Sequence, residues 1–348
     1  MVLALPAPEA VEAVEKFRAR LLNLDRGAAS RLIRLYEPIW TRLLGDFEAL
    51  SAQVASEGLT LAQAQRLARY QTLLGQVLVE FDAYAPAAAE MVTASQRASI
   101  ELARQASRTI VDAALPRGLN LGTLAQAGIG WNTLPTDAFI NLAGLAGNGA
   151  PLGNLLAELG PQVRAGITQA LGEGIALGTG PRQTASLIRN RFGMGLTRSL
   201  RISRTETLRS YRESTRMHYA SNKRIVKGYV RRTRQSPDTC FACIALDGKR
   251  YALSEPLNEH VSGRCVLVPV TLGYKDLGLN VQEAPAPVGN SRDWFRAQNP
   301  AVQRGMMGPR KFKAWKDGKF ELEDMAEIHH SDEWGDQAVE APLKSLVG

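Results

Sequence analysis

The sequence has 348 residues, 45% hydrophobic and 22% charged, which excludes a chain disordered throughout and leaves room for two or three domains. Its net charge of +8 comes from one segment, since residues 182–234 hold 15 Lys/Arg and two Asp/Glu. Such a local excess indicates an anionic partner. No apolar run reaches the roughly 18 residues of a membrane helix, and the N-terminus lacks a signal-peptide pattern, so we expect no membrane partner and synthesis in a reducing cytoplasm.

Residues 1–115 predict a helical region. Apolar residues recur every three or four positions from Val11 to Phe47, and Pro38 predicts a kink or a break in that helix. Thr60 predicts the N-cap of a further helix, and another is expected from about residue 86 to residue 114. The apolar stripes suit either ordinary core packing or docking on another subunit, and core packing is the more common of the two.

Residues 116–195 predict a Gly-rich helical connector. One helix is expected over 160–175, and a shorter one over 184–191 that Gly193 and Gly195 end. These glycines are not followed by the Lys-Ser/Thr pair of a phosphate-binding loop, which excludes a nucleoside triphosphate site of that kind.

Residues 196–275 predict a basic helix followed by a small β module. The helix is expected to run to about Asn222, with one apolar face. Its other face carries the candidate contacts for nucleic acid or a protein partner, which are Arg201, Arg209, Arg212 and Arg216. A solvated face explains such a stripe equally well, although the near absence of carboxylates favours DNA phosphate or an acidic protein surface. No base-reading motif is evident.

The β module is expected to be antiparallel. Residues 224–232 predict a strand. The pair Asp247 and Gly248, between two short β-type runs, predicts a hairpin turn in which both residues take positive φ. Cys265 begins a last predicted strand that Pro269 ends.

All three cysteines lie in this module, within a Cys-x2-Cys pair followed by His-x4-Cys. The candidate metal ligands are Cys240, Cys243, His260 and Cys265. Three thiolates and an imidazole suit tetrahedral Zn²⁺, and a closed shell of four protein ligands would be structural rather than catalytic. The alternative is three reduced cysteines and a surface histidine. A zinc deaminase is excluded, because it needs a His-x-Glu element and a proline directly before the first cysteine.

Residues 276–348 predict a linker and a C-terminal tail. The linker covers residues 283–290. A short helix over 293–299 is expected to end at Pro300, and the chain after Ile328 is expected to be polar and loose.

Several elements, taken in order, resemble the phage minor head, or head-morphogenesis, proteins of the Mu F-like type. They are Ser203-Arg204-Thr205-Glu206, Asp238-Thr239-Cys240-x-x-Cys243, Leu246-Asp247-Gly248, His260, and Arg264-Cys265 before a Val-rich strand that ends in Pro269. The likeness covers about residues 160–270, and the tail is similar around Trp315. The family often has a proline directly after the histidine and a further cysteine just before the Arg-Cys pair, where this chain has Val261 and Gly263.

The resemblance implies a virion protein of a few copies per particle, built into the head near the portal in the host cytoplasm, with contacts to the portal or major capsid protein and to packaged DNA. It implies no reaction, so we expect no enzyme. Arg204, Thr205 and Glu206 are assigned a structural role, with Glu206 pairing with Arg209 or fixing the helix against the sheet.

Two alternatives stay open: a zinc-stabilised nucleic-acid-binding regulator, and a metal-dependent nuclease, for which no carboxylate cluster is evident. The expected fold is α+β and mostly helical, with a helical N-terminal region, a long basic helix and a small antiparallel sheet module that carries a Cys3His cluster.

Overall fold

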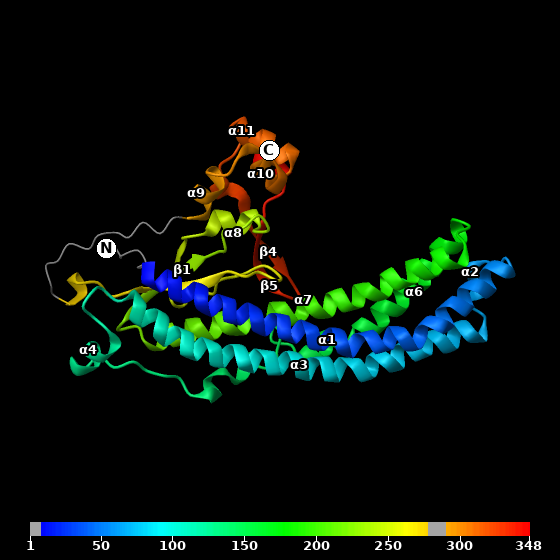
Figure 1. Ribbon diagram of the computed structural model, residues 1–348, viewed down its shortest axis with the longest axis horizontal. Coiled ribbons are helices and arrows are strands. Elements are labelled where there is room, and N and C mark those ends of the chain that lie inside the picture. The colour runs from blue at the N-terminus through cyan, green and yellow to red at the C-terminus, as the bar shows by residue number, and fades with distance from the viewer. Residues whose placement is uncertain (1–7, 278–289) are drawn as a thin grey trace. The chain divides into compact units, whose positions relative to one another are not determined.

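The computed structural model describes residues 8–277 and 290–348. Over these residues the chain is a mostly helical α+β protein with a three-stranded antiparallel sheet and a separate β-hairpin (Figure 1). The predicted fold class is therefore confirmed. The predicted linker lies outside the described residues except for Asn290. Across the described part of the chain, no helix has both the length and the apolar character that crossing a bilayer requires.

The chain folds into two compact units. Unit 1 comprises the described residues of Met1–Asn23, Arg97–Leu142 and Leu208–Gly348, and unit 2 comprises Leu24–Gln96 and Ala143–Thr207. The helices α1 (Pro8–Ser56), α3 (Ala68–Ala114) and α7 (Pro181–Ser221) each contribute residues to both units. The boundaries of the two units therefore differ from those of the four segments expected from the sequence, because each of these long helices has residues in both units.

Unit 2 is mainly helical and has an aromatic centre. Besides parts of the long helices, it contains α2 (Leu61–Ala64), α5 (Leu152–Ala157) and α6 (Leu159–Ala176). The centroid of the Tyr36 ring lies 5.0–5.5 Å from those of Phe81, Tyr84 and Phe192, and the centroid of the Phe81 ring lies 5.8–5.9 Å from those of Tyr84 and Phe192. Pro38 lies inside α1, and the helix expected to begin near residue 86 begins at Ala68. Both helices therefore continue past an internal proline, because packing of their buried apolar residues stabilises them.

The helix α7 continues through Gly193 and Gly195, where the sequence predicts an end. A Cβ at Gly195 would lie 2.4 Å from the Tyr36 hydroxyl oxygen and 2.7 Å from a Val163 methyl carbon, whereas a Cβ at Gly193 would meet nothing within 4 Å. Glycine at position 195 therefore allows helices of unit 2 to approach one another closely, and it does not end the helix.

The sheet of unit 1 has β1 (Val226–Arg232) at its centre. It pairs antiparallel with β2 (Arg250–Tyr251) on one side and β3 (Val266–Thr271) on the other. Pro269 lies within β3 opposite Tyr229 rather than ending the strand. This position is tolerated because β3 is an edge strand of the sheet.

A helix, α8 (Phe241–Leu246), stands where the sequence predicts the first strand of a hairpin. Gly248 has the predicted positive φ of 82°, but Asp247 has φ −60° and is the C-cap of α8. The predicted hairpin is therefore wrong, and β2 pairs with β1 instead. The helix is favoured because Phe241, Ile244 and Ala245, spaced at three and four, are buried against the C-terminal segment.

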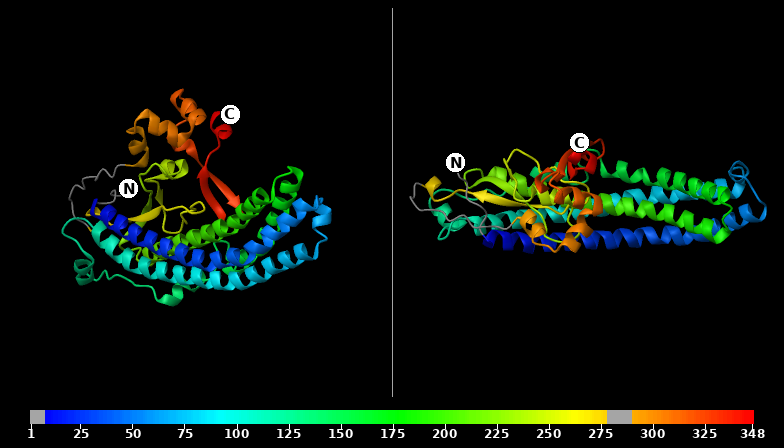
Figure 2. Two further views of the ribbon diagram at one scale, coloured as in Figure 1. Left: turned by 45° about the vertical axis from the view of Figure 1, so that its right-hand side comes forward. Right: turned by 90° about the horizontal axis from the view of Figure 1, so that it is seen from above.

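The C-terminal segment packs on α8 (Figures 1 and 2). Its elements are α9 (Ser291–Arg296), α10 (Pro300–Met307), α11 (Pro309–Lys316), η3 (Leu322–Met325), β4 (Ala326–Ser331), β5 (Gly335–Glu340) and α12 (Leu343–Val347). The chain after Ile328 was expected to be loose, yet β4 and β5 form a regular antiparallel hairpin. The N–H of Ala338 in β5 also donates to the Asn258 carbonyl at 2.8 Å, which ties the hairpin to the loop before His260.

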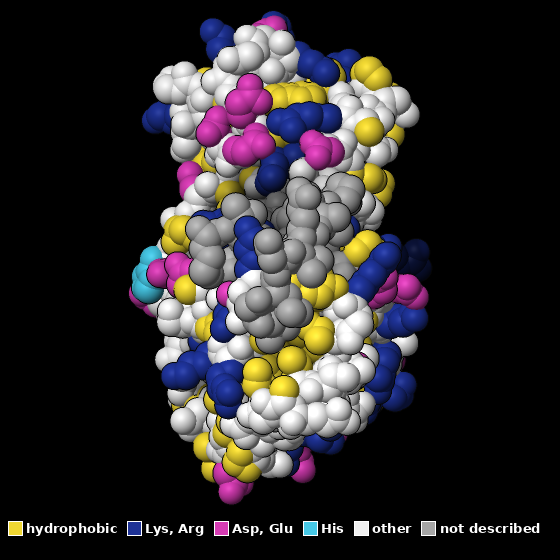
Figure 3. Space-filling view, turned by 90° about the vertical axis from the view of Figure 1, so that its left-hand side faces the viewer, with side chains coloured by type: hydrophobic (Ala, Val, Ile, Leu, Met, Phe, Trp, Pro, Cys, Tyr) yellow, Lys and Arg dark blue, Asp and Glu magenta, His cyan; other side chains and the backbone are white. Residues whose placement is uncertain are grey.

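The exposed face of this segment carries acidic and basic side chains next to one another (Figure 3). Arg296 lies 3.5–3.8 Å from the carboxylates of Asp293, Glu321 and Glu323. Such exposed pairs each contribute little to stability. The remaining elements of unit 1 are α4 (Leu121–Gln126), η1 (Thr136–Leu142) and η2 (Lys275–Leu277).

Candidate metal centre

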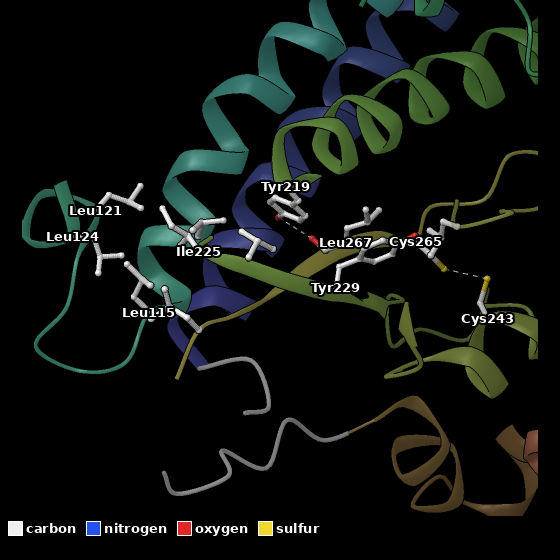
Figure 4. Close-up of a cluster of buried hydrophobic side chains, with 13 residues drawn as sticks. Leu115, Leu121, Leu124, Tyr219, Ile225, Tyr229, Cys243, Cys265 and Leu267 are labelled. Atoms are coloured by element: carbon white, nitrogen blue, oxygen red, sulfur yellow. Dashed lines mark hydrogen bonds between the residues drawn. The ribbon is translucent and has the colours of Figure 1, made fainter. Parts of the chain in front are cut away.

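The four predicted metal ligands come together in unit 1. Cys240 is the N-cap of α8. Cys243 lies in the first turn of that helix, and Cys265 directly precedes β3 (Figure 4). The Nε2 atom of His260 lies 3.2 Å from the Sγ atoms of both Cys240 and Cys243. The sulfurs of Cys243 and Cys265 are 3.3 Å apart. Residues separated by up to 25 positions therefore present their donor atoms to one small volume.

The local fold explains this convergence. The Sγ of Cys240 accepts a hydrogen bond from the Cys243 N–H at 3.4 Å, so the first turn of α8 holds both thiols of the Cys-x2-Cys pair on one side. Cys243 and Cys265 belong to a buried apolar cluster with Tyr229 and Leu257 (Figure 4). The carbonyl of Val261 lies 2.8 Å from Nδ1 of His260, a contact that leaves Nε2 to face the sulfurs.

Glu259 is a further candidate donor, which the sequence does not reveal. Its Oε1 atom lies 3.4 Å from the Cys243 sulfur and 3.2 Å from Nε2 of His260. Two overlapping groups of potential ligands result, each with its donor atoms within 4.8 Å of one another: Cys240, Cys243 and His260, and Cys243, Glu259 and Cys265. From the sequence, a single carboxylate in a polar loop is expected to be exposed to solvent. The fold shows instead that the side chain of Glu259 is 1% exposed.

Two buried arginines border the cluster. Arg231 on β1 is fully buried; its Nη2 atom donates to Oε2 of Glu259 at 2.8 Å and to the Cys243 sulfur at 3.5 Å. Arg212 on α7 is also buried and donates to the Gly263 carbonyl at 3.0 Å. Two guanidinium groups next to three thiols favour negative charge on the sulfurs.

The same surroundings shift the pKa values of the acidic groups. Burial alone would raise the pKa of the Glu259 carboxyl, but the neighbouring Arg231 cation, with His260 and Arg212, holds it below its ordinary value. Burial raises the pKa of the Cys265 thiol well above its ordinary value. The pKa of the Cys243 thiol is also raised, first through its hydrogen bond with Cys240. A bound cation counteracts both effects, because the thiolate is the form that ligates metal.

The donor set fits a metal ion. Tetrahedral zinc with Zn–S near 2.3 Å and Zn–N near 2.0 Å places its donor atoms roughly 3.5–3.8 Å apart. For these three pairs of donor atoms the separations of 3.2–3.3 Å lie a few tenths of an ångström below that range, and Cys265 joins the group of Cys240, Cys243 and His260 through its contact with Cys243. Four protein donors fill a tetrahedral shell, which is the arrangement of structural sites.

The arginines expected to face an anionic partner have different surroundings. Arg201, in unit 2, is exposed, whereas Arg209, in unit 1, is partly buried. Arg212 is buried beside the cysteine cluster, and Arg216 donates to the Leu253 carbonyl at 2.9 Å and pairs with Glu213 at 2.8 Å. Arg212 and Arg216 therefore bind within the chain, and the stripe is not one continuous exposed face.

The Arg204-Thr205-Glu206 triplet makes internal contacts in unit 2. The Nε of Arg204 lies 2.8 Å from a carboxylate oxygen of Asp25, and the Thr205 hydroxyl donates to a backbone carbonyl one turn earlier. The buried Glu206 carboxylate accepts a hydrogen bond from the Gly147 N–H at 3.0 Å. Glu206 thus fixes the loop at Gly147 to α7, a long-range contact that the sequence pattern did not indicate.

Comparisons with protein-family models, with curated proteins and with solved structures find no match for this chain.

Proposed function

We propose that this chain is a structural protein of a phage head, a minor head protein that joins the assembling particle near the portal vertex. The supporting observation is that Cys240, Cys243, His260 and Cys265, four residues of the pattern that resembles the Mu F-like type, belong to two overlapping groups of potential ligands that share Cys243. Two separate parts of that pattern, the Cys-x2-Cys pair and the His-x4-Cys element, therefore supply side chains to one candidate site.

The ion proposed for this cluster is Zn²⁺, in a structural role. Thiolate and imidazole donors suit zinc, and a shell filled by protein ligands holds elements together without binding a substrate. Here the ion would connect the start of α8 to the start of β3. The small module would then present a rigid surface to the portal or capsid protein, which the surrounding apolar cluster alone would hold less firmly.

The proposed contact with packaged DNA falls on the exposed cations of the basic segment. In unit 2, Arg201 lines an open pocket together with Arg191 and Arg198. Arg191 and Arg198 also pair with Glu173 and Glu158 at 2.8 and 3.2 Å, whereas Arg201 is exposed. A guanidinium in such a setting suits a phosphate of the nucleic-acid backbone, which carries no sequence information.

The deciding experiment is deletion of the gene with complementation by wild type or by Cys240→Ser. We expect defective heads after deletion, co-purification of the wild-type protein with portal, and little rescue by the variant. Infectious particles at wild-type yield after deletion would overturn the proposal. Elemental analysis of the purified chain tests the zinc assignment separately, with about one zinc per chain expected.

A salt titration of duplex binding tests the DNA contact. Arg201→Gln is expected to weaken binding equally across sequences and to reduce the salt slope by about one phosphate contact. A sequence preference would favour the regulator instead, and cleavage of plasmid DNA with divalent metal would favour the nuclease.

A further inference from the structure

The carboxylate of Glu259 is held in a fixed direction. Its side chain is 1% exposed, and that of its partner Arg231 is 0% exposed. Oε2 accepts the hydrogen bond from Arg231, which turns Oε1 toward Cys243 and His260. A buried carboxylate with one oxygen bound to a guanidinium and the other directed at a cluster of soft donors is oriented as metal-ligating carboxylates are.

The thiols explain the position of Oε1 only while they carry protons. A protonated Cys243 donates a hydrogen bond to Oε1, at a sulfur–oxygen distance of 3.4 Å. Once the sulfurs are thiolates around an ion, that donor is gone, and an anionic oxygen so near a thiolate is repelled. Direct binding of Oε1 to the cation removes the repulsion, because it replaces the lost donor with a positive charge.

Formal charge is balanced in such a site. Three thiolates and Glu259 carry four negative charges. A divalent ion together with the buried guanidinium groups of Arg231 and Arg212 carries four positive charges. Buried charges are tolerated when they are compensated in this way.

The absence of a side chain at Gly263 leaves space for the side chain of Glu259. A Cβ at Gly263 would lie 2.2 Å from Oε1 of Glu259 and 2.3–2.4 Å from its Cγ and Cδ atoms. Any larger residue at position 263 would therefore displace the carboxylate from the cluster.

We propose that Glu259 is a direct ligand of the metal through Oε1, positioned by Arg231 and admitted by Gly263. This inference rests on the proposed metal centre. It adds a fifth protein donor to the four described above, so the ion has two nitrogen or oxygen donors, from His260 and Glu259, beside its three thiolates, where a Cys3His site has one.

X-ray absorption spectroscopy of the full chain loaded with Zn²⁺ or Co²⁺ counts these donors. Affinity alone does not discriminate, because losing a residue outside the coordination shell also weakens metal binding about 10–100-fold. We expect two nitrogen or oxygen donors in the wild type and one in Glu259→Gln, with at least about tenfold weaker binding. Glu255→Gln is the matched control, since Glu255 is exposed and its carboxylate accepts from the Ala252 N–H.

Gly263→Ala keeps the carboxylate but moves it, and should show the same loss of one light donor. If Glu259→Gln does not fold, comparison of the Gly263→Ala spectrum with the wild-type spectrum still tests whether Glu259 is a ligand. One light donor in the wild type, unchanged in Glu259→Gln, would overturn the assignment of Glu259 and leave the metal centre intact. A wild-type chain that retains no metal would overturn the centre itself, and the ligand assignment with it.

Discussion

The carboxylate of Asp247 accepts two hydrogen bonds from Ser291, one from the backbone N–H at 2.8 Å and one from the hydroxyl at 2.7 Å. Its other oxygen accepts from the Thr233 N–H at 2.8 Å, and Arg232 lies 3.3 Å away. Asp247 is fully buried. One side chain therefore joins the C-terminus of α8, the end of β1 and the first residue of α9.

Asp247→Asn should destabilise the protein by about 3 kcal/mol, because the amide nitrogen of asparagine cannot accept these hydrogen bonds and Arg232 loses its anionic partner. Ser291→Ala should cost about 1 kcal/mol, since the backbone N–H still donates. Urea unfolding measures both. Asp317→Asn, which removes an exposed pair with Lys313, should change little. Equal effects from Asp247→Asn and Asp317→Asn would contradict the anchoring role.

The same residue shows where prediction from the sequence fails. The Asp-Gly pair is a strong hairpin signal, and Gly248 does take positive φ. A run as short as Ile244 to Leu246, however, fits a buried strand and a buried helix equally well. The contacts that decide for the helix come from Phe295 and Leu322, more than 40 residues away in the chain. No local pattern contains that information.

Gly193 and Gly195 form a matched pair inside α7. Gly193→Ala should stabilise the protein by about 0.5–1 kcal/mol. The added methyl group would have no neighbour within 4 Å, and alanine loses less backbone entropy than glycine on forming a helix. Gly195→Ala should destabilise by about 1–3 kcal/mol, because its methyl group would collide with Tyr36 and Val163. Thermal unfolding of the two variants gives the comparison. Stabilisation by both would mean that the helices do not approach closely at Gly195.

The candidate metal site was predictable in part. The Cys-x2-Cys pair and the His-x4-Cys element identify Cys240, Cys243, His260 and Cys265 by spacing alone, since sequence motifs for zinc are short and regular. Glu259 and Arg231 follow no such rule. They meet because β1 passes beside the loop before His260, and a pairing between a strand and a distant loop leaves no periodic trace in one sequence.

Removal of the proposed metal ion should loosen the module around the cluster and spare the aromatic centre of unit 2. With the ion removed by a chelator, the amides of α8 and β3 lose the link between them, and their hydrogen exchange should accelerate at least tenfold. The amides near Tyr36 should exchange as before. Hydrogen-exchange mass spectrometry resolves the two regions. Cys265→Ser should exchange fast at α8 with or without chelator, and equal protection of wild type in both conditions would contradict a structural ion.

His218 should make the stability of the protein depend on pH. The residue is fully buried on α7 beside Phe139, with a ring-centroid distance of 5.1 Å, and neither ring nitrogen has a hydrogen-bond partner among the described residues. Burial lowers its pKa to about 4, with a further lowering by Arg104 that Glu101 partly opposes. Folding therefore favours the neutral ring.

Well above pH 6.5, the ordinary pKa of histidine, both folded and unfolded chains are neutral at this position and His218 contributes no pH dependence. As the pH falls from 6.5 to about 4, the unfolded chain binds a proton that the folded chain does not, so stability is lost across that window. His218→Phe keeps an aromatic ring at this position but cannot bind a proton. The free energy of unfolding lost between pH 7 and pH 4.5 should therefore be smaller than in the wild type by at least about 1 kcal/mol. Urea unfolding at pH 7 and pH 4.5 measures it, with the exposed His329→Phe as control. A wild-type pH profile retained in His218→Phe would show that other groups cause the loss.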